Sequence, residues 1–133
     1  MITLNELNPH DVKLTAEQND NLPKLYNSIN QIRHLWNHPM IVTSGVRSVE
    51  DHKRIYLEKA QKSGLKNIRI PMGSMHLKAA AVDIADTDGS LYSWCKANPE
   101  ALSSAGLSCE EGTQGWVHFQ IYPPRSGKRW FYP

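Results

Sequence analysis

Three side chains in the second half of the sequence have the types and spacing to bind one metal ion. His76 and Asp83 are separated by six residues, and His118 follows 35 positions after Asp83. Two neutral imidazoles and one carboxylate leave a zinc ion an open fourth position for water, whereas structural zinc sites are usually closed by four ligands, often including cysteine. The trio therefore predicts one catalytic Zn²⁺ ion rather than a structural one.

A loop and two strands are predicted to position these side chains. Residues 79–84 (AAAVDI) precede an Asp-Thr-Asp-Gly turn, which favours a strand, although alanine by itself favours helix. Residues 116–122 alternate apolar and polar side chains in part, and this second predicted strand ends at a proline pair. His76 would lie at the end of a loop. If the two strands are neighbours, all three ligands can converge on one point.

The first third of the chain predicts one long helix. Residues 1–14 have the pattern of an extended, irregular segment, and Thr15 with Gln18 resembles a capping box. Apolar residues then recur at helical spacing. Pro23 indicates that the firm part of the helix begins near residue 22, and Pro39 ends it.

Shorter elements complete the predicted fold. Residues 40–43 are apolar and β-branched, which is typical of a buried strand. Ser48 with Asp51 begins a second helix that ends near Gly64, and residues 90–97 form a third. The sum predicts an α+β fold, with helices packed on a small, mostly antiparallel sheet.

The composition is that of an ordinary globular chain. It has 133 residues, of which 40% are hydrophobic and 21% charged, and this suits one domain with a modest core. The formal net charge of +2 is too small to indicate a nucleic-acid partner. No stretch approaches the ~20 apolar residues of a membrane span. We expect a monomeric domain over residues 1–133, with neither nucleic acid nor membrane as a partner.

The cysteines and the N-terminus bear on where the protein is made. Cys95 and Cys109 form no CxxC pair and are predicted to be free thiols that act as small apolar residues. The first residues show no basic region leading into an apolar one, so no signal peptide is predicted. Synthesis in a reducing compartment fits both observations.

Three blocks in the sequence, in this order, resemble the signature of a known family. They are residues 44–48 (SGVRS), residues 74–84 (from SMH to AVDI) and residues 115–118 (GWVH). The family comprises zinc peptidases that cut peptidoglycan peptides. Its members include D-alanyl-D-alanine carboxypeptidases and dipeptidases and phage L-alanyl-D-glutamate endopeptidases, and they share a fold with the hedgehog signalling domain.

The resemblance implies roles for individual residues. His76, Asp83 and His118 match the zinc ligands of the family. Arg47 matches an arginine that contacts substrate, either by holding a carboxylate or by polarising the scissile carbonyl, to which its planar fork is suited. Ser44 is a candidate substrate-binding residue, with a plain turn serine as the alternative.

The general base is where the sequence departs from the family pattern. Many relatives have a Glu or Asp three residues before the last histidine ligand, and Gly115 stands there in this chain. The nearest carboxylates upstream are Glu110 and Glu111. If side chains alternate along this segment, only one of the two can point at the metal. We favour Glu110, by resemblance to small phage members.

The resemblance thus implies a zinc metallopeptidase of the D,D-carboxypeptidase or L,D-endopeptidase type. Its expected substrate is the peptidoglycan stem peptide, and its expected setting is phage or prophage lysis, or a virion, acting on the cell wall. The alternative is a non-catalytic module on the same fold that binds peptide or cell wall, which Gly115 at the usual base position would favour. His52, one helical turn after Ser48, is predicted to face solvent.

Overall fold

The computed structural model of the chain describes residues 1–64, 72–123 and 126–132. Helices pack on a five-stranded sheet with strand order β1-β2-β4-β3-β5, in which β3 and β5 are parallel and the other neighbours antiparallel. The predicted α+β fold with a mostly antiparallel sheet is therefore confirmed. The elements are α1 (Leu4–Leu7), α2 (Ala16–Trp36), β1 (Val42–Ser44), α3 (Val49–Lys62), the 3₁₀ helix η1 (Met75–Lys78), β2 (Ala81–Asp86), α4 (Ser90–Ala97), α5 (Pro99–Ala105), β3 (Ser108–Glu110), β4 (Gly115–Gln120) and β5 (Trp130–Phe131).

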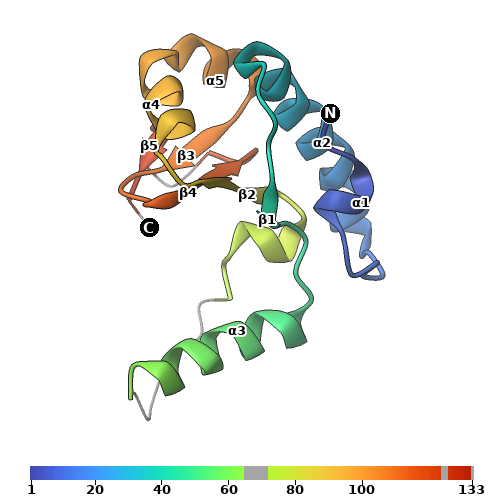
Figure 1. The fold of residues 1–133 in the computed structure, drawn as a ribbon. Coiled ribbons are helices and arrows are strands. Elements are labelled where there is room, and N and C mark those ends of the chain that lie inside the picture. Colours follow the sequence, from blue (N-terminus) through green and yellow to red (C-terminus); the bar gives the residue numbers. More distant parts are fainter. Residues whose placement is uncertain (65–71, 124–125, 133) are drawn as a thin grey trace.

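In the described part of the chain, four of the α-helices cover the core, and the fifth, α3, stands apart from them. Figure 1 shows α1, α2, α4 and α5 gathered around the sheet, while α3 extends away from this body on the far side of η1. The buried apolar side chains lie between the sheet and these four helices. They include Leu25, Ile29 and Ile32 of α2, Leu102 of α5, Val82 and Ile84 of β2, and Val117 and Phe119 of β4.

The alternation of side chains along β2 and β4 gives the sheet two chemically different faces. Val82 and Ile84 are fully buried beneath the helices, as are Val117 and Phe119 on the paired strand. Because successive strand residues point to opposite faces, Asp83 between the first pair must face the other side. The central strands therefore place these four apolar side chains in the core and Asp83 and its partner His118 on the opposite face.

The long helix α2 begins earlier than its sequence indicates. It starts at Ala16 and contains Pro23, so the predicted start near residue 22 is wrong, although the Thr15–Gln18 capping box is present. Its first turns are held by tertiary contacts. The side-chain amides of Gln18 and Asn21 donate through Nε2 and Nδ2 to the carbonyl oxygens of Leu77 and Lys78 of η1, each at 2.9 Å. These contacts favour helix on the N-terminal side of the proline.

Two short helices were not predicted. Residues 1–14 contain α1, capped by Thr3, and its Leu7 is fully buried, so the expectation of an irregular segment there is wrong. Helix α5 has Pro99 in its first turn and Gly106 as its left-handed cap. That pairing of proline and glycine is a signal that sequence reasoning could have used.

Other predicted elements lie close to the observed ones. The helix over residues 90–97 is found with the predicted bounds, and Ser48 caps α3 by accepting from the Asp51 amide. Both cysteines are free and buried, as predicted. Among the helices of the described ranges, none is both long and apolar enough to cross a membrane.

Gly45 provides a test of how the N-terminal segment is joined to the sheet. A Cβ atom at this position would collide with the backbone carbonyl of Leu7, whose oxygen accepts from the Val46 amide at 2.8 Å. We expect Gly45→Ala to lower the free energy of unfolding by roughly 1–3 kcal/mol, the usual range for overpacking. Urea denaturation measures the change. Gly73→Ala is the matched control, because nothing lies within 4 Å of a Cβ there; equal midpoints for the two variants would contradict the prediction.

Candidate metal centre

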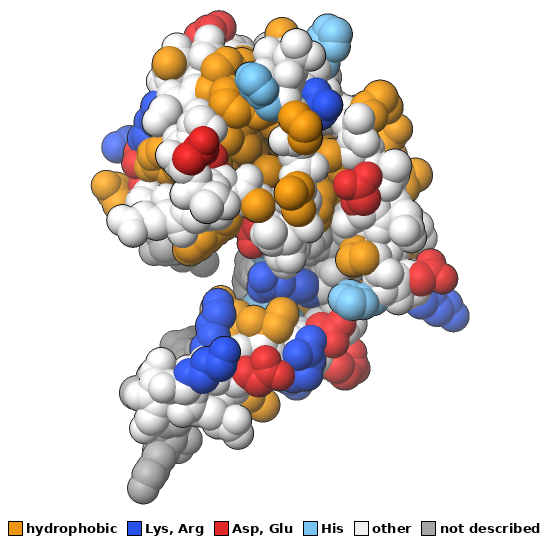
Figure 2. Space-filling view, viewed as in Figure 1, with side chains coloured by type: hydrophobic (Ala, Val, Ile, Leu, Met, Phe, Trp, Pro, Cys, Tyr) orange, Lys and Arg blue, Asp and Glu red, His pale blue; other side chains and the backbone are white. Residues whose placement is uncertain are grey.

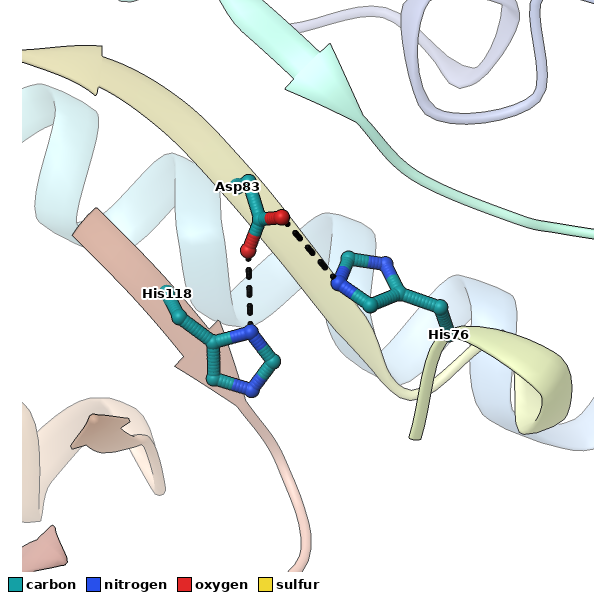
Figure 3. Close-up of side chains that lie close together, drawn as sticks. All are labelled: His76, Asp83 and His118. Atoms are coloured by element: carbon teal, nitrogen blue, oxygen red, sulfur yellow. Dashed lines mark hydrogen bonds and ion pairs between the residues drawn. The ribbon is translucent and has the colours of Figure 1, made fainter. Parts of the chain in front are cut away.

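The pairing of β2 with β4 brings two of the predicted ligands together. Asp83 and His118 are direct partners in the antiparallel register, so their side chains emerge side by side on the face opposite the core. His76 comes from η1, the 3₁₀ helix that precedes β2. Figure 3 shows the three side chains converging, with the carboxylate between the two imidazoles.

The three side chains are close enough to share one ion. His118 Nδ1 lies 2.9 Å from Asp83 Oδ1, and His76 Nε2 lies 3.3 Å from Asp83 Oδ2. Each residue offers one ligand atom, and these atoms all lie within 4.8 Å of one another. His76 is buried, whereas the side chains of Asp83 and His118 are each 14% exposed. The cluster is thus partly desolvated but open on one side.

Hydrogen bonds to the outer ring nitrogens determine which imidazole atoms point inward. His76 Nδ1 lies 2.8 Å from the carbonyl oxygen of Gly45, which can only accept, so Nδ1 carries the proton. The Gln120 amide nitrogen donates to the Tyr122 carbonyl at 2.8 Å, which turns its oxygen toward His118 Nε2 at 3.0 Å. Neutral imidazoles held in this way would direct the lone pairs of His76 Nε2 and His118 Nδ1 toward Asp83, where one metal ion would bind all three groups. Without an ion, protons on these two nitrogens make the hydrogen bonds to the carboxylate.

The charges within the cluster depend strongly on one another. Burial would raise the pKa of the Asp83 carboxyl, but hydrogen bonds from His118 and His76 outweigh it and hold that pKa well below its usual value. Burial would lower the pKa of His118, but its hydrogen bond to Asp83 raises that pKa above the usual value. Asp83 is therefore an anion at neutral pH, as a metal ligand must be.

The cluster opens into a cleft of about 460 Å³. Figure 2 shows the molecule hollowed between the body that holds the sheet and the helix α3. The sheet, β1, η1 and α3 all contribute to this space. It is lined by Thr43, Arg47, Tyr56, Lys59, Ser74, His76, Asp83, Glu110, Trp116 and His118. An ion held by the three ligands would be accessible to a substrate from the cleft.

The two candidate bases have different surroundings. Glu110, at the end of β3, lines the cleft. Glu111 instead accepts from Lys96 Nζ at 2.6 Å and from the Tyr92 hydroxyl at 3.2 Å, and the hydrogen bond from Lys96 lowers its pKa. Gly115 has a φ of 91°, a conformation that strains a residue with a side chain. A carboxylate at that position would be costly, and Glu110 supplies one to the cleft from the neighbouring strand.

Arg47 reaches the cleft with its guanidinium held from two sides. Its Nε donates to Ser44 Oγ at 3.0 Å, and its Nη1 lies 3.5 Å from His52 Nδ1. Ser44 therefore orients the arginine. His52 is fully buried, so the prediction that it faces solvent is wrong. The buried residues of α3 are His52 and Ala60, eight positions apart and so on one side of the helix, and this side faces the rest of the protein.

Comparison with known proteins identifies the family. A family model described as Peptidase M15 matches residues 2–120. A crystal structure of the Serratia marcescens L-Ala D-Glu endopeptidase ChiX has the same fold, with a TM-score of 0.51, 21% sequence identity, and coverage of 95% of this chain and 100% of that chain. No curated protein sequence shows a significant match. The family match extends over most of the chain and includes all three clustered residues. The chain therefore belongs to the Peptidase M15 family, in agreement with the motifs in its sequence.

Proposed function

We propose that the protein is a zinc metallopeptidase that hydrolyses peptide bonds in the stem peptides of bacterial peptidoglycan. The observation that carries this proposal is the convergence of His76, Asp83 and His118 at the base of an open cleft. Membership of a peptidase family and a fold shared with an L-Ala D-Glu endopeptidase support the substrate class.

The donor set favours one zinc ion. Two imidazole nitrogens and one carboxylate oxygen are the ligands of catalytic zinc sites that keep a position open. His76 would bind through Nε2, His118 through Nδ1 and Asp83 through its carboxylate, since the other ring nitrogens are engaged with Gly45 and Gln120. When bound, zinc would supply a Lewis acid that polarises the scissile carbonyl and lowers the pKa of the attacking water.

The residues around the ligands would handle the proton and the developing charge. Glu110 would accept the proton of the attacking water and deliver it to the leaving amine, because its carboxylate faces the cleft. Arg47 would hold a substrate carboxylate or the carbonyl oxygen as negative charge develops on it. Ser44 and His52 restrict the guanidinium, which reduces the entropy lost when substrate binds.

Within this activity, the chain is proposed to act either as an L,D-endopeptidase or as a D,D-carboxypeptidase. The biological setting proposed is cell-wall lysis by a phage or prophage, with synthesis in the bacterial cytoplasm. Zinc-loaded protein incubated with purified peptidoglycan should produce new amino termini, detected by mass spectrometry, that vanish with chelator. Binding without cleavage would instead support the non-catalytic module.

Removal of a ligand should abolish both metal binding and activity. We expect Asp83→Ala and His118→Ala to bind no zinc, measured by elemental analysis of the purified protein, and to release no fragments from peptidoglycan. His34→Ala is the matched control, because His34 is exposed on α2 outside the cleft. Full wall-cleaving activity in either ligand variant would reject the proposal.

Gln120 should tune zinc affinity without touching the ion. In Gln120→Met the side chain keeps its length but loses the oxygen that accepts from His118 Nε2. We expect zinc affinity to fall about 10–100-fold, the usual effect of removing such a partner, as measured by competition with a chromophoric chelator. Gln114→Met, at an exposed glutamine, controls for the substitution itself. Unchanged affinity in Gln120→Met would show that the hydrogen bond does not orient the ligand.

The assignment of the general base can be tested with a pair of neighbours. Glu110→Gln should lower kcat/KM by roughly 10²–10⁴-fold, the usual contribution of a general base, while the zinc content stays the same. Glu111→Gln should stay within a few-fold of the wild type, because Glu111 is engaged with Lys96 outside the cleft. The reverse pattern would assign the base to Glu111.

A further inference from the structure

One face of α3 carries a row of side chains, of which Tyr56 and Lys59 line the cleft. His52, Tyr56 and Lys59 are spaced at i, i+4 and i+7, which places them on the same side of the helix. The His52 and Tyr56 rings lie 4.9 Å apart, and Lys59 Nζ lies 5.3 Å from the centre of the Tyr56 ring. At the other end of the row, His52 contacts Arg47. The row thus joins two cations that both line the cleft.

The charges of the cleft are divided between its two walls. The sheet contributes the carboxylates of Asp83 and Glu110, and the opposite side contributes Arg47 and Lys59. A divalent ion at the metal centre would balance both carboxylates. The two cations would then leave the cleft with an excess of positive charge. Figure 2 shows Lys and Arg side chains beside the hollow, with acidic side chains among them on α3.

Lys59 differs from nearby Arg54 and Lys96 because it makes no ion pair within the described residues. Arg54 of α3 pairs with Asp51 and Glu58, and Lys96 pairs with Glu111. Within the described residues, the ion pairs include neither Arg47 nor Lys59. The position of Lys59 in the last turn of α3 favours a cation there, but Lys62 shares that position and does not line the cleft. Helix electrostatics alone therefore does not explain a lysine that lines the cleft.

A peptide carbonyl can accept a hydrogen bond from the Lys59 ammonium, but only a side-chain or terminal carboxylate also neutralises its charge. Building on the function proposed above, we propose that Lys59, supported by Tyr56, binds a carboxylate that the substrate carries near the scissile bond. Lys59 would thereby make the enzyme select stem peptides in which this group is ionised over those in which it is amidated.

The spacing along α3 separates this role from that of Arg47. The Arg47 amide donates to the carbonyl oxygen of His76 at 3.2 Å, which ties the arginine to the segment that carries a metal ligand. Lys59 lies seven residues beyond His52, about 10 Å along the helix axis at ~1.5 Å per residue. An extended peptide advances about 3.3–3.6 Å per residue, so a substrate that contacted both Arg47 and Lys59 would span roughly three residues between them.

A set of synthetic stem peptides tests the proposal, with one parent peptide and derivatives in which each carboxyl group is converted in turn to a primary carboxamide. We expect one conversion to lower kcat/KM of the wild-type, zinc-loaded protein about tenfold, as expected for loss of a charge-assisted hydrogen bond. In Lys59→Met the same two peptides should be cleaved at nearly equal rates. Lys62→Met, on the same turn of α3, should keep the tenfold preference.

The outcomes separate this inference from the function on which it rests. Cleavage of every peptide by the wild type at equal rates would overturn the role of Lys59 and leave the peptidase intact. A preference that persists in Lys59→Met would do the same. If the zinc-loaded wild type cleaves none of the peptides, the proposed function itself fails, and this inference with it. Zinc content and circular dichroism of each variant confirm that the fold is retained.

Discussion

The antiparallel register between β2 and β4 is the constraint on which the rest of the site depends. It sets Asp83 directly opposite His118 while the residues on either side, Val82 and Ile84, enter the core. A shift of one residue would turn the apolar side chains outward and bury the carboxylate and imidazole without partners. The free energy of core burial therefore also fixes the geometry of the proposed ligands, and no separate interaction is needed to bring these two side chains together.

The remaining parts of the site are held by polar contacts that tie distant segments to this strand pair. Gln120 contacts His118 and donates to the Tyr122 carbonyl, and the Tyr122 hydroxyl donates to Asn21 at 2.6 Å. Asn21 in turn donates to Lys78 at the end of η1. A chain of hydrogen bonds thus links one imidazole to the 3₁₀ helix that carries the other. Buried polar residues on α2, which contribute little apolar area to the core, are explained by this role.

The cleft combines two walls of different origin and different charge. The sheet wall carries Asp83, Glu110 and His118 on strands, of which β2 and β4 have their opposite faces buried, and η1 adds the His76 imidazole beside them. The opposite wall carries Arg47 and, on α3, Tyr56 and Lys59, and α3 stands apart from the other helices (Figure 1). In the proposed function, chemistry belongs to the first wall and recognition of the substrate to the second. Substrate preference could then change on α3 without disturbing the proposed metal ligands.

The sequence by itself determined the α+β class, the bounds of α4 and the candidate trio of metal-binding residues, because these depend on local signals: residue type, capping boxes and apolar periodicity. By resemblance it also reduced the candidates for the base to two adjacent glutamates. Only the tertiary structure shows that Glu110 lines the cleft while Glu111 pairs with Lys96, because this ion pair joins residues far apart in the sequence. The same reason explains the burial of His52, the start of α2 before Pro23 and the contact of Gln120 with His118. Each depends on a partner brought close by folding, and a local pattern carries no information about such a partner.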